Sequence, residues 1–503
     1  MTRTFILFVF IFKLLTGGIC FGVDQGKIVS TSIQLNETDS IDAITLALSK
    51  LVIETNANDI PDSVYMAAKA AMLDALGCAF AGHDGSGIPE IIKLTKHWGG
   101  LGESTIWFDG TSVPVTEATF INSVQLHAMD FDDYHPPSDA HITAVLVPTV
   151  LAVGELNNAS GKEILAALVL GTEVIGRLGS AYKARRTHAG FLPTSVIGGF
   201  GATAAACRLQ KCSVEETVNA MGIWYAHASG NRQALYDRTL TKRIQPGIAA
   251  KASVFACYLA HAGITGPTRI IGEQPGSLMQ IYGCDTDLEA PTLDEVMPLR
   301  DTWQIEQLDY KRYACCGYSS MAIKTAIEFS SMNDIEPDRI KEIRLFGDNI
   351  DSPFAGVLWD DSPTPQVLAQ FCVTYAVASA TKNHRYGPEE ISVQRISQDQ
   401  DVDSLARRIK ICDWSEWVGL RPDVSFAMQI DLKDGNSIVQ TFESFKRYEW
   451  PEDYDDLVFK FKENIAFSGM LDEVEADELI SAIENFESCK NITDFIKKWL
   501  VYE

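Results

Sequence analysis

The segment HAMDFDDYHPPSDAH, residues 127–141, gathers three histidines and four aspartates. Side chains of both types bind metal ions or transfer protons near neutral pH. The segment has neither a His-x-x-x-His pair nor an Asp-x-Asp-x-Asp-Gly loop, which are the spacings typical of zinc and calcium sites. Phe131, Tyr134 and the rigid pair Pro136–Pro137 would hold the histidines in defined places, as proton transfer requires. The segment therefore favours an acid–base site, with a metal site and a solvated polar loop as alternatives.

Helices are expected on both sides of this segment. Residues 61–82 carry alanine and leucine at helical spacing and end in a glycine. The pairs Ser160–Glu163 and Ser213–Glu216 have the capping-box spacing that marks the start of a helix. Residues 247–263 are apolar almost all round, which predicts a helix buried on most faces.

The pattern changes after about residue 300. Residues 340–347 alternate like a strand, and the turn Asp434-Gly435-Asn436 separates two alternating runs within residues 425–444, which predicts a hairpin. Helical periodicity returns from Pro451. The predicted fold is mainly α with an inserted α+β lid domain: residues 40–303 and 443–503 form an all-helical domain, and residues 304–442 form the lid.

Composition and charge narrow the class of protein. A chain of 503 residues with 46% hydrophobic residues can bury a large core. Its formal net charge of −25 argues against nucleic acid as a partner, because such proteins present a basic surface to the phosphates. An anionic substrate would need local cations, and the pairs Lys242-Arg243 and Lys311-Arg312 are candidates; as isolated pairs they also suit a solvated surface.

Three motifs in this order resemble the MmgE/PrpD family. They are MDFDDYH followed by His141 and VLVPTVLAVGE, then TKRIQPGIAAKASVFACYLAHAGITGP, then KRYACCGYSSMAIKTAIEF. The resemblance runs from about residue 40 to the end. It implies the two-domain fold, a site in the cleft between the domains, a homodimer, and no metal or organic cofactor. Family members include 2-methylcitrate dehydratase, cis-aconitate decarboxylase and iminodisuccinate epimerase.

The resemblance implies a set of site residues. Asp130, His141 and Lys242 match the family's catalytic positions, whereas His127 is expected to be structural. These reactions remove or deliver a proton on a carbon beside a carboxylate, and cations must stabilise the negative charge that develops. The remaining candidates, for substrate binding, are Asp133, Tyr134, His135, Arg243, Gln245, Lys311, Cys316, Tyr318 and Ser320.

The sequence departs from the family pattern at three places. Gln245 and Tyr134 stand where relatives often carry histidine and threonine, and residues 311–320 lack the family's lid histidine. No local histidine would activate Cys315 or Cys316, so packing is the favoured role of the two thiols. The leading hypothesis is a lyase that dehydrates or decarboxylates a citrate- or aconitate-like acid of specialised metabolism, with or without an alkyl substituent. An isomerase, epimerase or cyclase for a less charged metabolite, and a non-catalytic binding protein, are the alternatives.

The first 22 residues, MTRTFILFVFIFKLLTGGICFG, predict a secretory signal peptide cleaved near Gly22, with a retained anchor as the alternative. Asn36, Asn158 and Asn491 begin N-glycosylation sequons, which suit that route. No later segment is expected to span a membrane. The cysteines outside the leader form no C-x-x-C pair, and one or two disulfides are compatible with an oxidising compartment.

Overall fold

A computed structural model describes most of the chain. The described residues are 41–185, 190–272, 274–283, 289–298, 302–333, 335–347, 350–352, 354–414, 424–443 and 450–502. The chain divides into two compact units, residues 1–40 and residues 41–503. The predicted signal peptide and the sequon at Asn36 lie outside the described residues, so both stay predictions.

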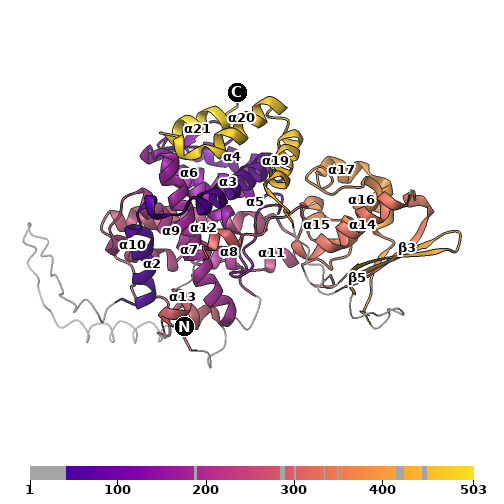
Figure 1. Cartoon of the computed structure of the whole chain (residues 1–503), viewed down its shortest axis with the longest axis horizontal. Helices are drawn as coiled ribbons and strands as arrows, with labels where there is room; N and C mark the ends of the chain where they lie inside the picture. Colours follow the sequence, from indigo (N-terminus) through magenta and orange to yellow (C-terminus); the bar gives the residue numbers. More distant parts are fainter. Residues whose placement is uncertain are drawn as a thin grey trace, which may run out of the picture. The chain divides into compact units, whose positions relative to one another are not determined.

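Most helices of the second unit share one hydrophobic core (Figure 1). The C-terminal helices, yellow in Figure 1, return to this core, where α19 lies against α3. The elements are α2 (Ala43–Glu54), α3 (Asp62–Gly82), α4 (Ile88–Trp98), α5 (Val115–His127), α6 (Thr143–Asn157), α7 (Gly161–Arg185), α8 (Pro193–Val196), α9 (Gly198–Leu209), α10 (Val214–Tyr225), α11 (Gln233–Tyr236), α12 (Thr241–His261), α13 (Leu293–Val296), α19 (Tyr454–Ser468), α20 (Glu473–Glu484), α21 (Ile492–Trp499) and the short pair β1 (Ser104–Thr105) and β2 (Ser112–Val113).

The predicted helix signals are confirmed. The helix expected over residues 61–82 is α3. Glu163 N–H bonds to the Ser160 hydroxyl and the Glu163 carboxylate accepts from Ser160 N–H, which caps the start of α7. The same reciprocal pair joins Ser213 and Glu216 at the start of α10. The helix expected over residues 247–263 begins earlier, at Thr241, and continues through Pro246 to His261.

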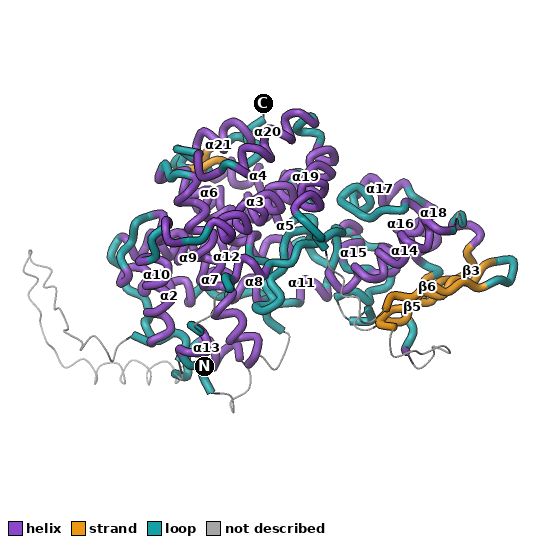
Figure 2. Tube along the Cα trace, viewed as in Figure 1, coloured by secondary structure: helices purple, strands orange, loops and turns teal. Residues whose placement is uncertain are grey.

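A second core surrounds a four-stranded sheet in the order β4-β3-β5-β6. The predicted strand is β3 (Ile340–Gly347), and the predicted hairpin is β5 (Val424–Leu432) with β6 (Ser437–Glu443). β4 (Ile409–Ile411) runs parallel to β3, and the other pairs are antiparallel. α14 and α16 pack against the sheet (Figure 2). The helices here are α14 (Ser320–Met332), α15 (Pro365–Gln370), α16 (Val373–Asn383), α17 (Val393–Gln398) and α18 (Gln400–Ala406).

The fold prediction, a mainly helical chain with a small mixed sheet in its C-terminal part, is confirmed. The expectation that no segment after the leader has the length and apolarity of a membrane span was wrong. Asp62–Gly82 and Gly161–Ala184 meet both criteria, but 78% and 89% of their most apolar windows are buried inside the protein. Their apolarity serves the core, whose neighbouring helices cover them on most faces.

Candidate active site

The histidine- and aspartate-rich segment forms the connection between α5 and α6. Two of its residues, Asp130 and Asp139, have left-handed backbone conformations, with φ of 51° and 60°. Such conformations are uncommon outside glycine and cluster at functional sites, where the surrounding structure imposes them. Tyr134 pairs through its backbone with Asp309, and His135 pairs with Ala140. The segment is therefore a fixed, mostly buried loop and not a solvated one.

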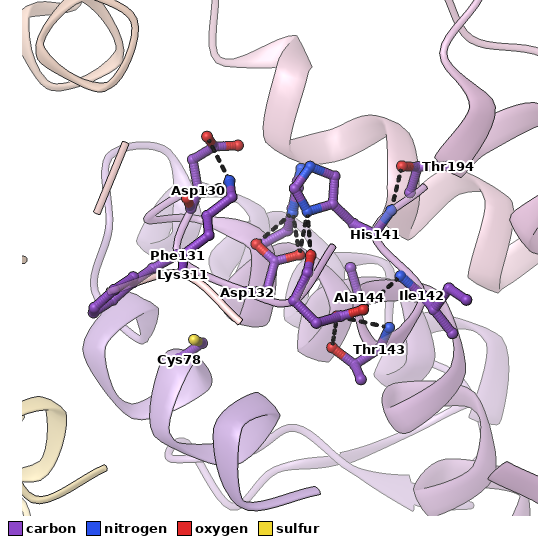
Figure 3. Close-up of polar contacts among 12 residues, drawn as sticks. Cys78, Asp130, Phe131, Asp132, His141, Ile142, Thr143, Ala144, Thr194 and Lys311 are labelled. Atoms are coloured by element: carbon purple, nitrogen blue, oxygen red, sulfur yellow. Dashed lines mark hydrogen bonds and ion pairs between the residues drawn. The ribbon is translucent and has the colours of Figure 1, made fainter. Parts of the chain in front are cut away.

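Asp130 is the centre of a buried ion cluster. Its carboxylate binds the ammonium group of Lys242, from the first turn of α12, and that of Lys311 at 3.0 Å. Figure 3 shows the ion pair between the Asp130 and Lys311 side chains. Lys311 also donates to the backbone carbonyl of Asp130 at 2.8 Å. Burial alone would raise the pKa of Asp130, but the two ammonium groups outweigh it and hold this pKa below its usual range. The carboxylate is ionised at neutral pH.

The two lysines differ in their readiness to lose a proton. Burial lowers the pKa of Lys242 in spite of Asp130 beside it. Burial also disfavours charge on Lys311, yet Asp130 and Asp132 together raise the pKa of Lys311 above its ordinary value. Lys242 is therefore the lysine suited to proton transfer, and Lys311 is suited to remain a fixed positive charge.

Asp132 holds two histidines in place. Its carboxylate lies 2.9 Å from Nδ1 of His127 and 3.2 Å from Nδ1 of His141. Nε2 of His127 lies 2.8 Å from the Lys242 ammonium, so this nitrogen accepts and Nδ1 carries the proton toward Asp132. Burial lowers the pKa of His127 to about 4, so its ring is neutral at pH 7. His127, expected to be structural, connects Asp132 to Lys242.

His141 is oriented from several sides. Its backbone N–H bonds to the Thr194 hydroxyl, and its ring lies beside Asp132 (Figure 3). Nδ1 also donates to the carbonyl of Asp133 at 2.7 Å. These oxygens take up the Nδ1 proton, so Nε2 is the nitrogen that would meet a substrate.

A cavity of about 740 Å³ opens onto these groups. It contains eight of the twelve residues expected from the sequence: Asp130, Tyr134, His141, Lys242, Lys311, Cys316, Tyr318 and Ser320. The lining comes from the first core, from the segment after residue 308, and from Phe354, Phe371 and Trp450. The structure thus brings the distant Lys242 and Lys311 motifs to the histidine- and aspartate-rich loop.

Asp133 and His135, two of the remaining expected residues, lie behind the cavity wall. The Asp133 carboxylate accepts from the backbone N–H groups of Ile142 and Thr143, which fixes the loop at the start of α6. Burial and the neighbouring Asp132 raise the pKa of Asp133 to about 6. His135 is buried with Nδ1 2.8 Å from the Ser138 hydroxyl, and burial lowers its pKa to about 4.

Arg243 and Gln245 do not line the cavity either. The Arg243 guanidinium donates to the carbonyl of Ser86 and to Gln366. Gln245 accepts from the N–H of Asn231 at 2.7 Å and donates to the carbonyl of the same residue at 3.0 Å. Gln245, which stands at a histidine position of the family pattern, therefore holds a neighbouring loop.

Other lining groups could not be assigned from the sequence. Arg232 reaches the cavity, pairs with Asp139 at 3.1 Å and stacks over the Phe354 ring at 4.9 Å. Tyr134 donates its hydroxyl proton to the same Asp139 carboxylate. Phe371 lies beneath the Lys242 ammonium, 5.4 Å from it. The left-handed conformation of Asp139 is visible only in the structure, and Arg232 belongs to none of the three family motifs, so the sequence did not identify either residue.

Support from behind comes from the C-terminal helices. Lys460 of α19 is fully buried; its ammonium donates to Asp74 at 2.6 Å and to the carbonyl of Phe131 at 2.7 Å. The same group lies 3.9 Å from the centre of the Phe131 ring. Phe131 stands between Asp130 and Asp132, so Lys460 fixes the backbone that carries both carboxylates.

Comparison with known protein families finds two matching domains in this chain. The MmgE/PrpD N-terminal domain matches residues 46–289, and the MmgE/PrpD C-terminal domain matches residues 313–488. The chain belongs to the MmgE/PrpD family. The family includes lyases, such as cis-aconitate decarboxylase, that act on small carboxylates.

The MmgE/PrpD relatives of this chain are distant but aligned over most of their length. A cis-aconitate decarboxylase of Aspergillus terreus (strain NIH 2624 / FGSC A1156) is 21% identical over 487 residues, covering 92% of this chain and 97% of the relative. The cis-aconitate decarboxylases of Mus musculus and Homo sapiens are each 24% identical; they cover 90% of this chain and 93% and 95% of their own lengths.

The metal alternative for this segment has one geometric basis. His127, Asp132 and His141 each offer a ligand atom, and these atoms lie within 4.8 Å of one another. The Lys242 ammonium, however, lies 2.8 Å from the second nitrogen of His127. A divalent cation would meet this positive charge at close range, so the arrangement favours proton transfer over metal binding.

Proposed function

We propose that the protein is a cofactor-independent lyase that removes carbon dioxide or water from an aconitate- or citrate-like acid with an apolar substituent. One observation carries the proposal: His141, Lys242, Lys311 and Asp130 line one cavity. Asp132 and His127 connect His141 to Lys242 through hydrogen bonds and ion pairs. Such a set supplies both a proton carrier and a fixed positive charge.

In decarboxylation, the bond from carbon to the leaving carboxylate breaks and its electron pair passes into the adjacent unsaturated system. Lys311 lies where it would stabilise that negative charge. A proton then goes to carbon, from Nε2 of His141 when both of its ring nitrogens are protonated, or from the Lys242 ammonium, whose pKa burial lowers. Dehydration would use the same groups, with a proton leaving carbon and the hydroxyl departing as water.

Charge and apolarity of the cavity bear on the substrate. Three basic side chains line it, Lys242, Lys311 and Arg232, but Asp130 and Asp139 already pair with them. The pairing leaves one positive charge in surplus, which favours an anionic substrate such as a carboxylate. Leu192, Leu235, Phe354 and Trp450 also line the cavity and would receive an alkyl group.

A product-resolved assay tests the proposal. The purified chain is incubated with cis-aconitate, 2-methylcitrate and alkyl-substituted homologues, and substrate loss, carbon dioxide and products are followed by mass spectrometry. We expect turnover of at least one acid, with kcat reduced 10²- to 10⁴-fold in His141→Gln and Lys242→Met, the range of general acid–base contributions. Lys251→Met, a half-buried lysine on the same helix that pairs with Glu117 outside the cavity, and His97→Gln serve as matched controls. Unchanged turnover in both site variants would remove the mechanism.

A second candidate is an isomerase, epimerase or cyclase for a less charged metabolite. The observation in its favour is that six aromatic residues line the cavity against three lysines and arginines: Tyr134, Tyr310, Tyr318, Phe354, Phe371 and Trp450. It would use the same proton carriers but release no fragment. Conversion of a substrate to a product of equal mass would support it over the lyase, and ligand binding without any conversion would instead indicate a binding protein.

A further inference from the structure

A second cluster of chemically active side chains lies outside the cavity. The sulfurs of Cys207, Cys212 and Cys257 lie within 4.8 Å of one another, and all three residues are buried free thiols. Cys212 is also adjacent to His261, whose Nδ1 lies 3.8 Å from its sulfur and 3.0 Å from the Glu216 carboxylate. The spacing along the chain is Cys-x4-Cys-x44-Cys-x3-His.

The backbone is shaped to bring these ligands together. α9 ends just after Cys207, and Lys211 then takes a left-handed conformation with φ of 60°. This turn brings Cys212 back over the helix end, where its N–H bonds to the Cys207 carbonyl at 2.9 Å. Cys257 and His261 are one turn apart on α12, which places their side chains on the same face.

Distances and charge both suit a tetrahedral thiolate site. With Zn–S near 2.3 Å and Zn–N near 2.0 Å, ligand atoms of a zinc site lie about 3.6–3.8 Å apart. The 3.8 Å between the Cys212 sulfur and His261 Nδ1 is close to this range. The three sulfurs lie within 4.8 Å of one another and His261 joins them through Cys212, so the four side chains would move closer together around an ion. Three thiolates and one zinc ion carry a net charge of −1, and Arg208 and Lys211 line the same small cavity as Cys212.

We propose that Cys207, Cys212 and Cys257, with His261 as the fourth ligand, form a structural zinc site that joins the end of α9 to the end of α12. The family resemblance implies a protein without a metal, and this proposal departs from that expectation at a cluster outside the acid–base site. Closed four-ligand sites of cysteine and histidine are typical of structural zinc, which has no open position for chemistry. At 1.5 Å per residue, Cys257 lies about 22 Å along α12 from Lys242, so the ion stabilises the helix without touching the cavity.

Two other roles for three adjacent thiols predict different results. Cysteines packed as small apolar side chains would bind no metal, and an oxidised pair would leave a disulfide between two of the three. Neither role uses His261, whose ring is partly exposed and held by Glu216. A carboxylate that orients a histidine is a common companion of a metal ligand.

Elemental analysis of the full chain, purified without chelator from zinc-supplemented medium under reducing conditions, tests the site. We expect about one zinc per chain in the wild type and a loss of at least tenfold in Cys207→Ser and Cys257→Ser. His261→Ala should weaken retention against a chelator. Cys372→Ser is the matched control, because Cys372 is buried elsewhere and its sulfur accepts the Tyr375 N–H, as a serine would. Cobalt substitution gives an independent readout in the wild type, the visible bands of tetrahedral thiolate-bound cobalt, should a variant fail to fold.

Three results would overturn the proposal. These are wild-type protein without zinc or cobalt bands, zinc content unchanged in Cys257→Ser, and a disulfide among Cys207, Cys212 and Cys257 in the freshly purified protein by mass spectrometry. A zinc content that falls in Cys207→Ser and Cys257→Ser but stays unchanged in Cys372→Ser supports the proposal. The readout is metal content, so its outcome is separate from the success or failure of the proposed lyase activity.

Discussion

Replacing the buried Lys460 with methionine should destabilise the protein and disturb the site at once. The Lys460 ammonium satisfies the Asp74 carboxylate and the Phe131 carbonyl, and it is shielded from water by the core. The substitution Lys460→Met keeps the length of the apolar stem but removes the charge and its donors. A carboxylate is then left without its partner in the core.

The expected loss of unfolding free energy is about 4 kcal/mol. Removing one partner of a buried ion pair typically costs about 3–5 kcal/mol, because the remaining charge is uncompensated. Burial already raises the pKa of Asp74, and losing Lys460 removes the largest opposing influence. Since the folded pKa of this acid then lies further above its unfolded value of about 3.9, the added cost grows as pH rises above that value. The deficit should be larger at pH 8 than at pH 5.

Urea unfolding followed by fluorescence measures the effect. The double variant Asp74→Leu/Lys460→Met buries no charge, so its deficit should shrink to about 1–3 kcal/mol, the cost of the unsatisfied Phe131 carbonyl. Lys462→Met, on the same helix and paired with Asp477 at the surface, should cost under about 1 kcal/mol. The reasoning fails if Lys460→Met costs less than about 1 kcal/mol, or if the double variant loses as much as the two single variants together.

Further consequences can be checked in parallel. Lowering the pH from 7 to 4 charges His127, whose pKa is about 4 in the fold against about 6.5 when unfolded; this costs about 3 kcal/mol of stability, and His127→Gln should flatten that dependence. In Gly199→Ala the new Cβ would lie 2.1 Å from the Trp224 ring, so the melting temperature should fall clearly; an unchanged value would contradict the close packing of α9 on α10. Gln245→Ala removes both hydrogen bonds to Asn231 and should cost about 1–3 kcal/mol while raising KM more than it lowers kcat; the reverse split would assign Gln245 to the chemistry.

The fold could be predicted from local signals because those signals are strong. Local interactions determine several of the predicted elements, and the folded protein retains them. They include the capping boxes at Ser160 and Ser213, the strand of residues 340–347 and the turn at Gly435. The prediction underestimated the length and apolarity of α3 and α7, because a helix buried in a core can have the composition of a membrane span. The homodimer, the secretory route and glycosylation at Asn158 and Asn491 stay predictions.

The site was less predictable, since its geometry depends on contacts between distant segments. The family motifs located Asp130, His141, Lys242 and Lys311, which the structure places around one cavity. The position of a residue within a motif does not predict which side of its helix the side chain occupies. Arg243 follows Lys242 directly yet does not line the cavity, because neighbouring helical residues are about 100° apart.

Solvent deuterium tests the central claim most directly. In D₂O the wild type should convert an aconitate-type acid to a decarboxylated product that carries one deuterium on the newly protonated carbon. His141→Gln and Lys242→Met should form that product at least 100-fold more slowly, whereas Lys251→Met should match the wild type. Deuterium-free product, or wild-type rates in both site variants, would contradict proton transfer by the groups around Asp130.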